Sequence, residues 1–191
     1  LVRKLGERVL PEIIPILEKG LDSECDKQRQ GVCIGLSEIM ASTSRDMVLT
    51  FVDSLVSTVR RALSDPLSDV RKAAAKTFDS LHSAVGQKAL DDILPSMLKG
   101  LADPDPDVAD WTLDGLKQII TIKSRVVLPY LVPQLTAPPV NTKALSILCQ
   151  AGEGLTKYLP KILPSILDSL AAVNGTADEN RVIEDCQLII L

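Results

Sequence analysis

The chain has 191 residues, with 21 basic and 25 acidic side chains and a formal net charge of −4, and 46% of its residues are hydrophobic although it contains only two Phe, one Trp and two Tyr. The negative charge argues against a surface dominated by contacts with nucleic-acid phosphates. The shortage of aromatic residues argues against an ordinary globular core, and it favours closely stacked helices that pack through Leu, Ile, Val and Ala. We therefore expect an all-α fold.

A recurring turn signal predicts about five helical hairpins. The segment LSDPLSDV (63–70) reappears further along the chain as LADPDPDV (101–108), and RQGVCIGLSEI (29–39) corresponds in the same way to RKAAAKTFDSL (71–81). Repeating two-helix units of this length are typical of an α-solenoid, in which each hairpin buries its apolar face against its neighbours. We expect hairpins at 9–45, 46–86, 87–124, 125–156 and 157–191, with second helices at 27–42, 68–84, 107–122, 140–154 and 178–190.

Proline marks the expected helix boundaries. Leu-Pro pairs suggest that first helices start near four prolines, because the first helical turn tolerates the missing N–H: Pro11, Pro95, Pro129 and Pro160. Three of these are followed one helical turn later by a second proline, which we expect to bend the helix: Pro15, Pro133 and Pro164.

The break at Pro66 shows how one hairpin is expected to form. Proline ends the first helix and restricts Asp65 before it, and Ser68 or Asp69 is expected to cap the second helix. Helical spacing then places six residues on faces that we expect to be largely buried: Val70, Ala74, Leu81, Val108, Leu116 and Ile119.

Both ends of the sequence suggest a segment of a longer array, because it starts at Leu1 rather than Met and stops inside the apolar pattern EDCQLIIL. No secretory signal is recognisable, and the longest uncharged run, 126–142, contains four prolines and is not expected to span a membrane. The four cysteines lack metal-binding spacing, so we expect free, buried thiols and a cytosolic or nuclear location. Asn174-Gly175-Thr176 matches a glycosylation sequon, but without a secretory signal we interpret it as a loop.

Candidates for catalytic or metal chemistry are weak. Asp103, Asp105 and Asp107 resemble the first ligands of a calcium loop, but the sixth position is Val108 instead of Gly and the twelfth is Asp114 instead of Glu. The single His82 is expected to face solvent without a nucleophile beside it, and no glycine-rich phosphate loop is present. We therefore predict no catalytic, metal-binding or cofactor-binding residue, and no enzyme.

Charged side chains on neighbouring second helices form the candidate site. Lys72, Lys76 and Asp79 correspond in the next repeat to Asp110, Asp114 and Lys117, so every charge is inverted. One interpretation is mutual pairing between repeats, which contributes about 0–1 kcal/mol for each exposed pair. The other is a partner-binding ridge of six residues, supplemented by Gln30 and Ser37: Arg71, Lys72, Lys76, Asp110, Asp114 and Lys117. The basic cluster formed by Arg60, Arg61, Arg71, Lys72 and Lys76 is expected to be solvated surface, with RNA contact as the alternative.

The hairpins, the Asp-Pro turn and the stretch DVRKAAAKTF resemble HEAT repeats over nearly the whole chain. Four stretches are more specific: LGERVLPEIIPILEKGL, RQGVCIGLSEIM, LDDILPSMLKGL and KSRVVLPYLVPQLTAPPVNTKAL. They resemble the family of giant HEAT-repeat translational activators of the general amino-acid control pathway. The resemblance implies a cytoplasmic scaffold that binds ribosomes, particularly stalled ones, and helps activate the kinase that phosphorylates the alpha subunit of initiation factor two, with the kinase docking through other parts of the protein.

A second interpretation stays open on the sequence. A HEAT-type scaffold of nuclear transport or of a phosphatase would show the same periodicity, and its groove would hold cargo or a subunit. Co-sedimentation with polysomes favours the first interpretation, and binding to a small transport GTPase favours the second.

Overall fold

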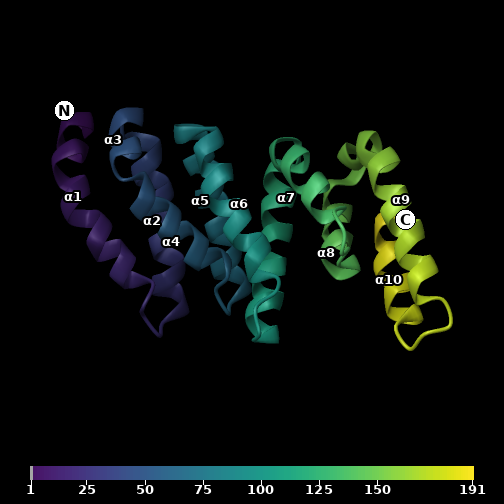
Figure 1. Ribbon diagram of the computed structural model, residues 1–191. Coiled ribbons are helices and arrows are strands. Elements are labelled where there is room, and N and C mark those ends of the chain that lie inside the picture. The colour runs from purple at the N-terminus through teal and green to yellow at the C-terminus, as the bar shows by residue number, and fades with distance from the viewer. Residues whose placement is uncertain (1) are drawn as a thin grey trace. The chain divides into compact units, whose positions relative to one another are not determined.

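Helices form every regular element of residues 2–191, which are the residues that the computed structural model describes, with side chains from residue 8 onward (Figure 1). No strand occurs among these residues, and the all-α solenoid class is confirmed. The elements are α1 (Val2–Gly20), α2 (Asp26–Ser42), α3 (Arg45–Thr50), α4 (Val52–Leu63), α5 (Ser68–Val85), α6 (Gln87–Gly100), α7 (Pro106–Leu135), α8 (Thr142–Ser146), the 3-10 helix η1 (Ile147–Tyr158), α9 (Leu159–Val173) and α10 (Glu179–Ile190).

The chain divides into two compact units, the first ending at Ile122 and the second beginning at Lys123. The division falls inside α7, where Lys123 has non-helical dihedral angles (φ −134°, ψ 40°). The first unit therefore holds α1 to α6 and the first part of α7, and the second unit holds the remainder of α7 and the elements that follow.

Four of the five predicted second helices are confirmed within one residue. Three of them are α2, α5 and α10, and the prediction of 107–122 agrees with the part of α7 that precedes Lys123. The prediction of a helix over 140–154 is wrong, because only α8 is α-helical there and a 3-10 helix continues the chain. Gly152 explains the difference: it adopts a positive φ of 52°, which a helix does not allow, and a second glycine follows at Gly154.

The prolines mark helix starts less well than predicted. Pro160 lies in the first turn of α9, as expected, but Pro11, Pro95 and Pro129 lie well inside helices. Pro11 and Pro129 are exposed, so the carbonyl group that each proline leaves without an intrahelical partner can be hydrated.

The core of the first unit lies where α5 packs against α2, α4 and α6 (Figure 1). Five of the six residues predicted to be buried are at most 1% exposed: Val70, Ala74, Leu81, Leu116 and Ile119. Val108 is the exception and is only half-buried, because it lies in the first turn of α7 beside an exposed loop. None of the described helices has the length and hydrophobicity needed to span a membrane. All four cysteines are free, but the prediction that they are buried holds only for Cys33 and Cys186, because Cys25 is exposed and Cys149 is partly exposed.

The turn before α5 forms differently from the prediction. Ser68 and Asp69 already belong to the helix, and the residue before it, Leu67, provides no side-chain cap. Instead Asp65 Oδ1 accepts a hydrogen bond from the Leu67 N–H at 2.9 Å. Asp65 is therefore the residue that orders this turn, and its side chain is only 7% exposed.

Candidate interaction surface

Arg29, in the first turn of α2, joins two neighbouring hairpins. Its guanidinium donates to both carboxylate oxygens of Asp65, at 2.7 and 3.2 Å. It also donates to the backbone carbonyls of Ser23 and Glu24 in the turn that leads into its own helix, at 2.8 and 3.2 Å. The hydrogen bond with Asp65 raises the pKa of Arg29 above its ordinary value, although partial burial acts in the opposite direction.

Arg71 makes the same kind of contact one repeat later. It donates to the backbone carbonyls of Asp65 and Pro66, at 2.6 and 3.0 Å, and to Asp114 Oδ2 on α7 at 2.7 Å. Both arginines therefore bind two carbonyls of the turn before their own helix and a carboxylate of the next hairpin. We call this arrangement the arginine clasp. A planar guanidinium with several N–H donors is suited to it, and a lysine is not.

The clasp stops at the third hairpin. The residue that corresponds to Arg71 there is Ala109, and the preceding turn is held by aspartates instead. Asp103 Oδ1 accepts from the Asp105 N–H and Asp105 Oδ1 accepts from the Asp107 N–H, each at 2.9 Å. The carboxylates that resemble a calcium loop thus order a local turn, and no cluster of three or more metal-ligating side chains occurs within the described residues.

Close backbone contact also joins the first part of α7 to α4. A Cβ atom added at Gly115 would lie 2.1 Å from the carbonyl oxygen of Leu63, so α7 approaches the end of α4 more closely than any other residue would allow. Beside this contact the hydroxyls of Ser64 and Thr112 lie 2.9 Å apart and share a hydrogen bond. Glycine and small polar residues at these positions therefore set the separation of the helices.

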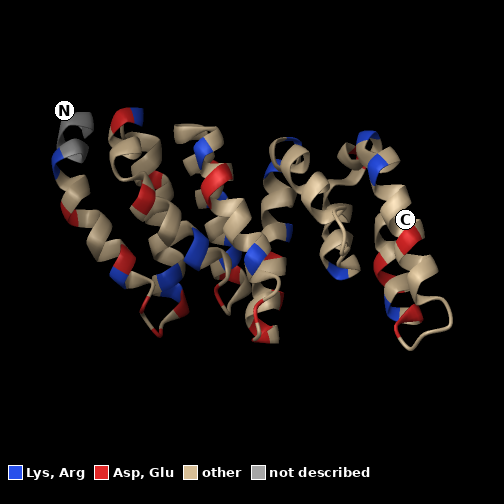
Figure 2. Cartoon of the chain, in the orientation of Figure 1, with Lys and Arg blue, Asp and Glu red and all other residues tan. Residues whose placement is uncertain are grey.

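The structure divides the six candidate ridge residues into two groups. Arg71 and Asp114 bind each other, and their side chains are only 10% and 29% exposed. The other four are exposed on α5 and α7, and we call them the second-helix row: Lys72, Lys76, Asp110 and Lys117. Figure 2 marks the positions of acidic and basic residues along the helices.

The expected rung between Lys76 and Asp114 is replaced by another pair. Asp114 pairs with Arg71 rather than with Lys76, and Lys72 lies 3.5 Å from Asp69 on its own helix. The repeat of the turn signal predicted which positions correspond, but it did not show that Arg71 is long enough to reach Asp114. Arg29 and Arg71 occupy corresponding positions in neighbouring repeats, and this match in the sequence could have revealed the clasp.

Comparisons with known proteins agree with the repeats. Residues 127–191 match a family model described as "Stalled ribosome sensor GCN1-like, HEAT repeats". Over its whole length the chain is 60% identical to the Homo sapiens protein "Stalled ribosome sensor GCN1", and over 94% of its length it is 38% identical to the Saccharomyces cerevisiae "eIF-2-alpha kinase activator GCN1". It spans 7% of the length of each of these relatives.

A solved structure of a computationally designed armadillo repeat protein for modular peptide recognition aligns with 98% of this chain and 85% of its own, at 14% identity and a TM-score of 0.43. The family match and the alignments with GCN1 rest on sequence, and they agree with the helical hairpins described above. The chain is similar over its whole length to one segment of the GCN1 proteins, and residues 127–191 match a GCN1-like HEAT-repeat model.

Proposed function

We propose that this chain is a non-catalytic interaction segment of a cytoplasmic, ribosome-associated translational activator, which helps activate the kinase that phosphorylates initiation factor two alpha. One observation carries the proposal: 60% identity over the whole chain to a protein named as a stalled ribosome sensor. The similarity to a yeast protein named as an eIF-2-alpha kinase activator supports the link to the kinase. These similarities favour the translational activator over a scaffold of nuclear transport or of a phosphatase.

The second-helix row is the surface that we propose for contact with the ribosome. It presents three lysines and one aspartate on an otherwise acidic chain, and Lys76 and Lys117 are exposed. The arginine clasp binds Arg71 to Asp114 and holds α5 beside α7. A group of exposed cations on helices that are held together is suited to the phosphates of RNA or to an acidic protein surface.

Charge reversal in the full-length parent protein tests this assignment. A variant with Lys72→Glu, Lys76→Glu and Lys117→Glu is expected to co-sediment with ribosomes at least about threefold less than the wild type, because each reversal replaces attraction to phosphate with repulsion. Phosphorylation of initiation factor two alpha during amino-acid starvation is expected to fall with it.

The matched control reverses three exposed cations of the first helices of the hairpins: Arg8, Arg45 and Lys99. It makes the same change in net charge, and it is expected to leave ribosome binding near the wild-type level. Equal loss in both variants would mean that net charge alone matters, and intact binding of the first variant would remove the second-helix row from the interface. Failure of the wild-type parent to co-sediment with ribosomes would overturn the proposed function itself.

A further inference from the structure

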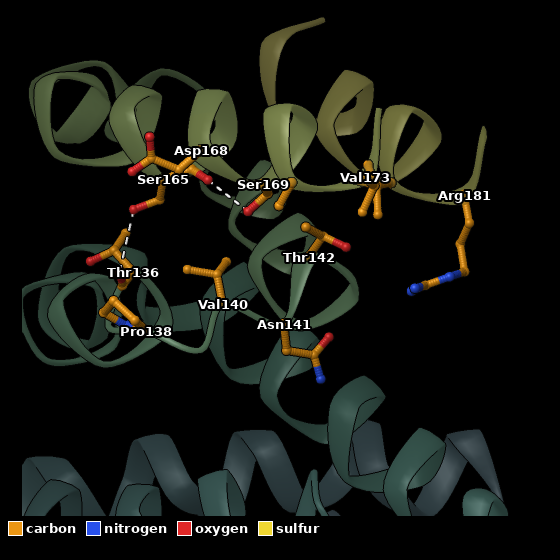
Figure 3. A pocket seen from close by; sticks show the side chains of 12 residues that line it. Thr136, Pro138, Val140, Asn141, Thr142, Ser165, Asp168, Ser169, Val173 and Arg181 are labelled. Atoms are coloured by element: carbon orange, nitrogen blue, oxygen red, sulfur yellow. Dashed lines mark hydrogen bonds between the residues drawn. The ribbon is translucent and has the colours of Figure 1, made fainter. Parts of the chain in front are cut away.

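The second unit contains an open groove. Residues 136–182 enclose a volume of about 570 Å³ between the loop that follows α7, the helix α9 and the start of α10 (Figure 3). Figure 3 shows Ser165, Asp168 and Ser169 of α9 across from Thr136 and Val140 of the loop. The groove lies wholly inside the second unit.

The local sequence explains why the groove is open. The segment 136–141 separates α7 from α8, and the adjacent prolines Pro138 and Pro139 prevent this segment from continuing the helix. No arginine clasp draws this loop inward among the described residues of the second unit. The loop therefore belongs to neither helix and forms one wall of the groove.

Hydrogen bonds hold the walls of the groove in place. Ser165 Oγ donates to the carbonyl of Thr136 at 3.3 Å and links α9 to the loop. Thr142 Oγ1 donates to Asp185 Oδ2 at 2.8 Å and links α8 to α10. Asn141 caps α8 by accepting from the Ala144 N–H at 3.1 Å. The groove is thus a preformed feature of the fold.

The lining combines three kinds of surface. Pro138, Val140 and Val173 provide apolar contact, and the hydroxyls of Ser165 and Ser169 lie one helical turn apart along α9. Ser169 Oγ donates to the carbonyl of Ser165 at 2.7 Å, which leaves its oxygen able to accept a hydrogen bond from a ligand. Such a mixture suits a chain of amide groups that carries small apolar side chains.

The lining of the groove has two charged side chains, Asp168 and Arg181, and only Arg181 has ion-pair partners in the part of the chain that the structure describes. Arg181 lies 3.4 Å from Asp178 and 4.0 Å from Asp185, so its positive charge is compensated within α10 and the residue before it. Asp168 is exposed, and it forms no ion pair and no side-chain hydrogen bond among the described residues. The free carboxylate favours a cationic ligand and disfavours phosphate.

We propose that this groove binds a short extended peptide segment of a partner protein, with a basic side chain against Asp168 and a small apolar side chain against Val140 and Val173. The hydroxyls of α9 accept hydrogen bonds from the backbone N–H groups of the peptide. Such a peptide could bind whether or not the second-helix row contacts a ribosome, so this site is separate from the proposed function.

Fluorescence anisotropy with the full-length parent protein tests the site. The probe is a fluorescein-labelled hexapeptide, Gly-Arg-Val-Arg-Val-Gly, and its counterpart has Glu in place of both Arg residues. The Arg peptide is expected to bind the wild type and the Glu peptide is not. Asp168→Lys is expected to weaken binding of the Arg peptide at least about fivefold, because attraction becomes repulsion at the same position.

Two further variants separate the site from general charge effects. Glu153→Lys makes the same charge change at an exposed position outside the groove and is expected to leave binding unchanged. Ala172→Trp introduces an indole at an exposed position of the lining and is expected to block the peptide without lowering the melting temperature. Equal binding of both peptides, equal weakening by Asp168→Lys and Glu153→Lys, or full binding by Ala172→Trp would each overturn the proposal.

Discussion

At the scale of single residues, the arginine clasp shows how one side chain can serve two hairpins. The carbonyls that Arg71 binds belong to a turn that also carries the partner of Arg29, because Asp65 gives its carboxylate to Arg29 and its carbonyl to Arg71. Asp65 thereby connects the two clasps. Burial of these charges is tolerable because each donor and acceptor has a partner, and no buried side-chain nitrogen or oxygen among the described residues lacks one.

Removal of Arg71 should therefore destabilise the chain. We expect Arg71→Ala to lower the free energy of unfolding by about 2–3 kcal/mol, somewhat less than for a fully buried pair, because the Asp114 side chain keeps 29% of its exposure. Urea denaturation measures the change. Arg61→Ala is the control, since Arg61 and Asp22 are 49% and 66% exposed and their loss should cost less than about 1 kcal/mol. Equal costs for the two variants would show that the clasp contributes no more than a surface ion pair.

Cys33 gives a prediction for alkaline pH. Burial, assisted by the nearby Asp65 carboxylate, raises the pKa of the Cys33 thiol from its ordinary value of 9.0 to about 11. As the pH rises, the unfolded chain loses this proton first, so ionisation favours unfolding. The contribution of the thiol is intact below about pH 9 and is lost by about pH 11, with a magnitude of roughly 2–3 kcal/mol.

The free energy of unfolding of the wild type should thus fall more steeply between these pH values than that of Cys33→Ala. Parallel pH dependence of the two proteins would contradict the assignment. Iodoacetamide offers an independent measurement, because the exposed Cys25 should be alkylated well before Cys33 in the folded chain.

At the scale of helices, the smallest residues set the distance between neighbouring helices. Gly115 allows α7 to touch the backbone at the end of α4, and a backbone carbonyl cannot rotate away as a side chain can. We expect Gly115→Ala to lower the free energy of unfolding by about 1–3 kcal/mol, despite the better helix propensity of alanine.

Gly31→Ala is the matched control for this substitution. A Cβ atom at Gly31 would have no atom within 4 Å, so alanine there should stabilise α2 by roughly 0.5–1 kcal/mol. Opposite signs for the two glycines in a chemical melt are the expected result. A stabilising effect at both positions would mean that α7 can move away from α4 without cost.

The periodicity of the sequence predicted the second helices better than the prolines predicted the starts of the first helices. Phased Leu residues located α2, α5 and α10, because an apolar face repeats every turn, and the Asp-Pro turn marked the start of α5 as well. The 3-10 helix after α8 could not be predicted from apolar spacing, since it depends on the positive φ of Gly152. Pro11 and Pro95 were expected at helix starts, but α1 and α6 continue on both sides of them. Each proline removes one backbone hydrogen bond, and a helix tolerates this loss where the unbonded carbonyl is hydrated or packed.

At the scale of the whole molecule, the sequence predicted the class of fold and the corresponding positions of neighbouring repeats. It did not predict which charged residues would be exposed, because that depends on how far a side chain reaches across a helix pair. Arg71 and Asp114 therefore appeared as surface candidates, although they bind each other. In the sequence, the only sign of the groove beside α9 is that the segment TAPPVN (136–141) differs from the Asp-Pro turns of the earlier hairpins. The volume of the groove arises from tertiary packing.

The arginine clasp also has a consequence for how the turns can change in length. Because Arg29 and Arg71 each reach back to carbonyls at the same two positions before them, one inserted residue would displace both carbonyls from the guanidinium. In the turn from Asp103 to Asp107 the side-chain hydrogen bonds found among the described residues come from carboxylates that accept from the backbone two residues later, so no distant arginine measures its length as in the two clasps. Insertions and epitope tags should accordingly be accepted between α6 and α7 and rejected before α2 and α5.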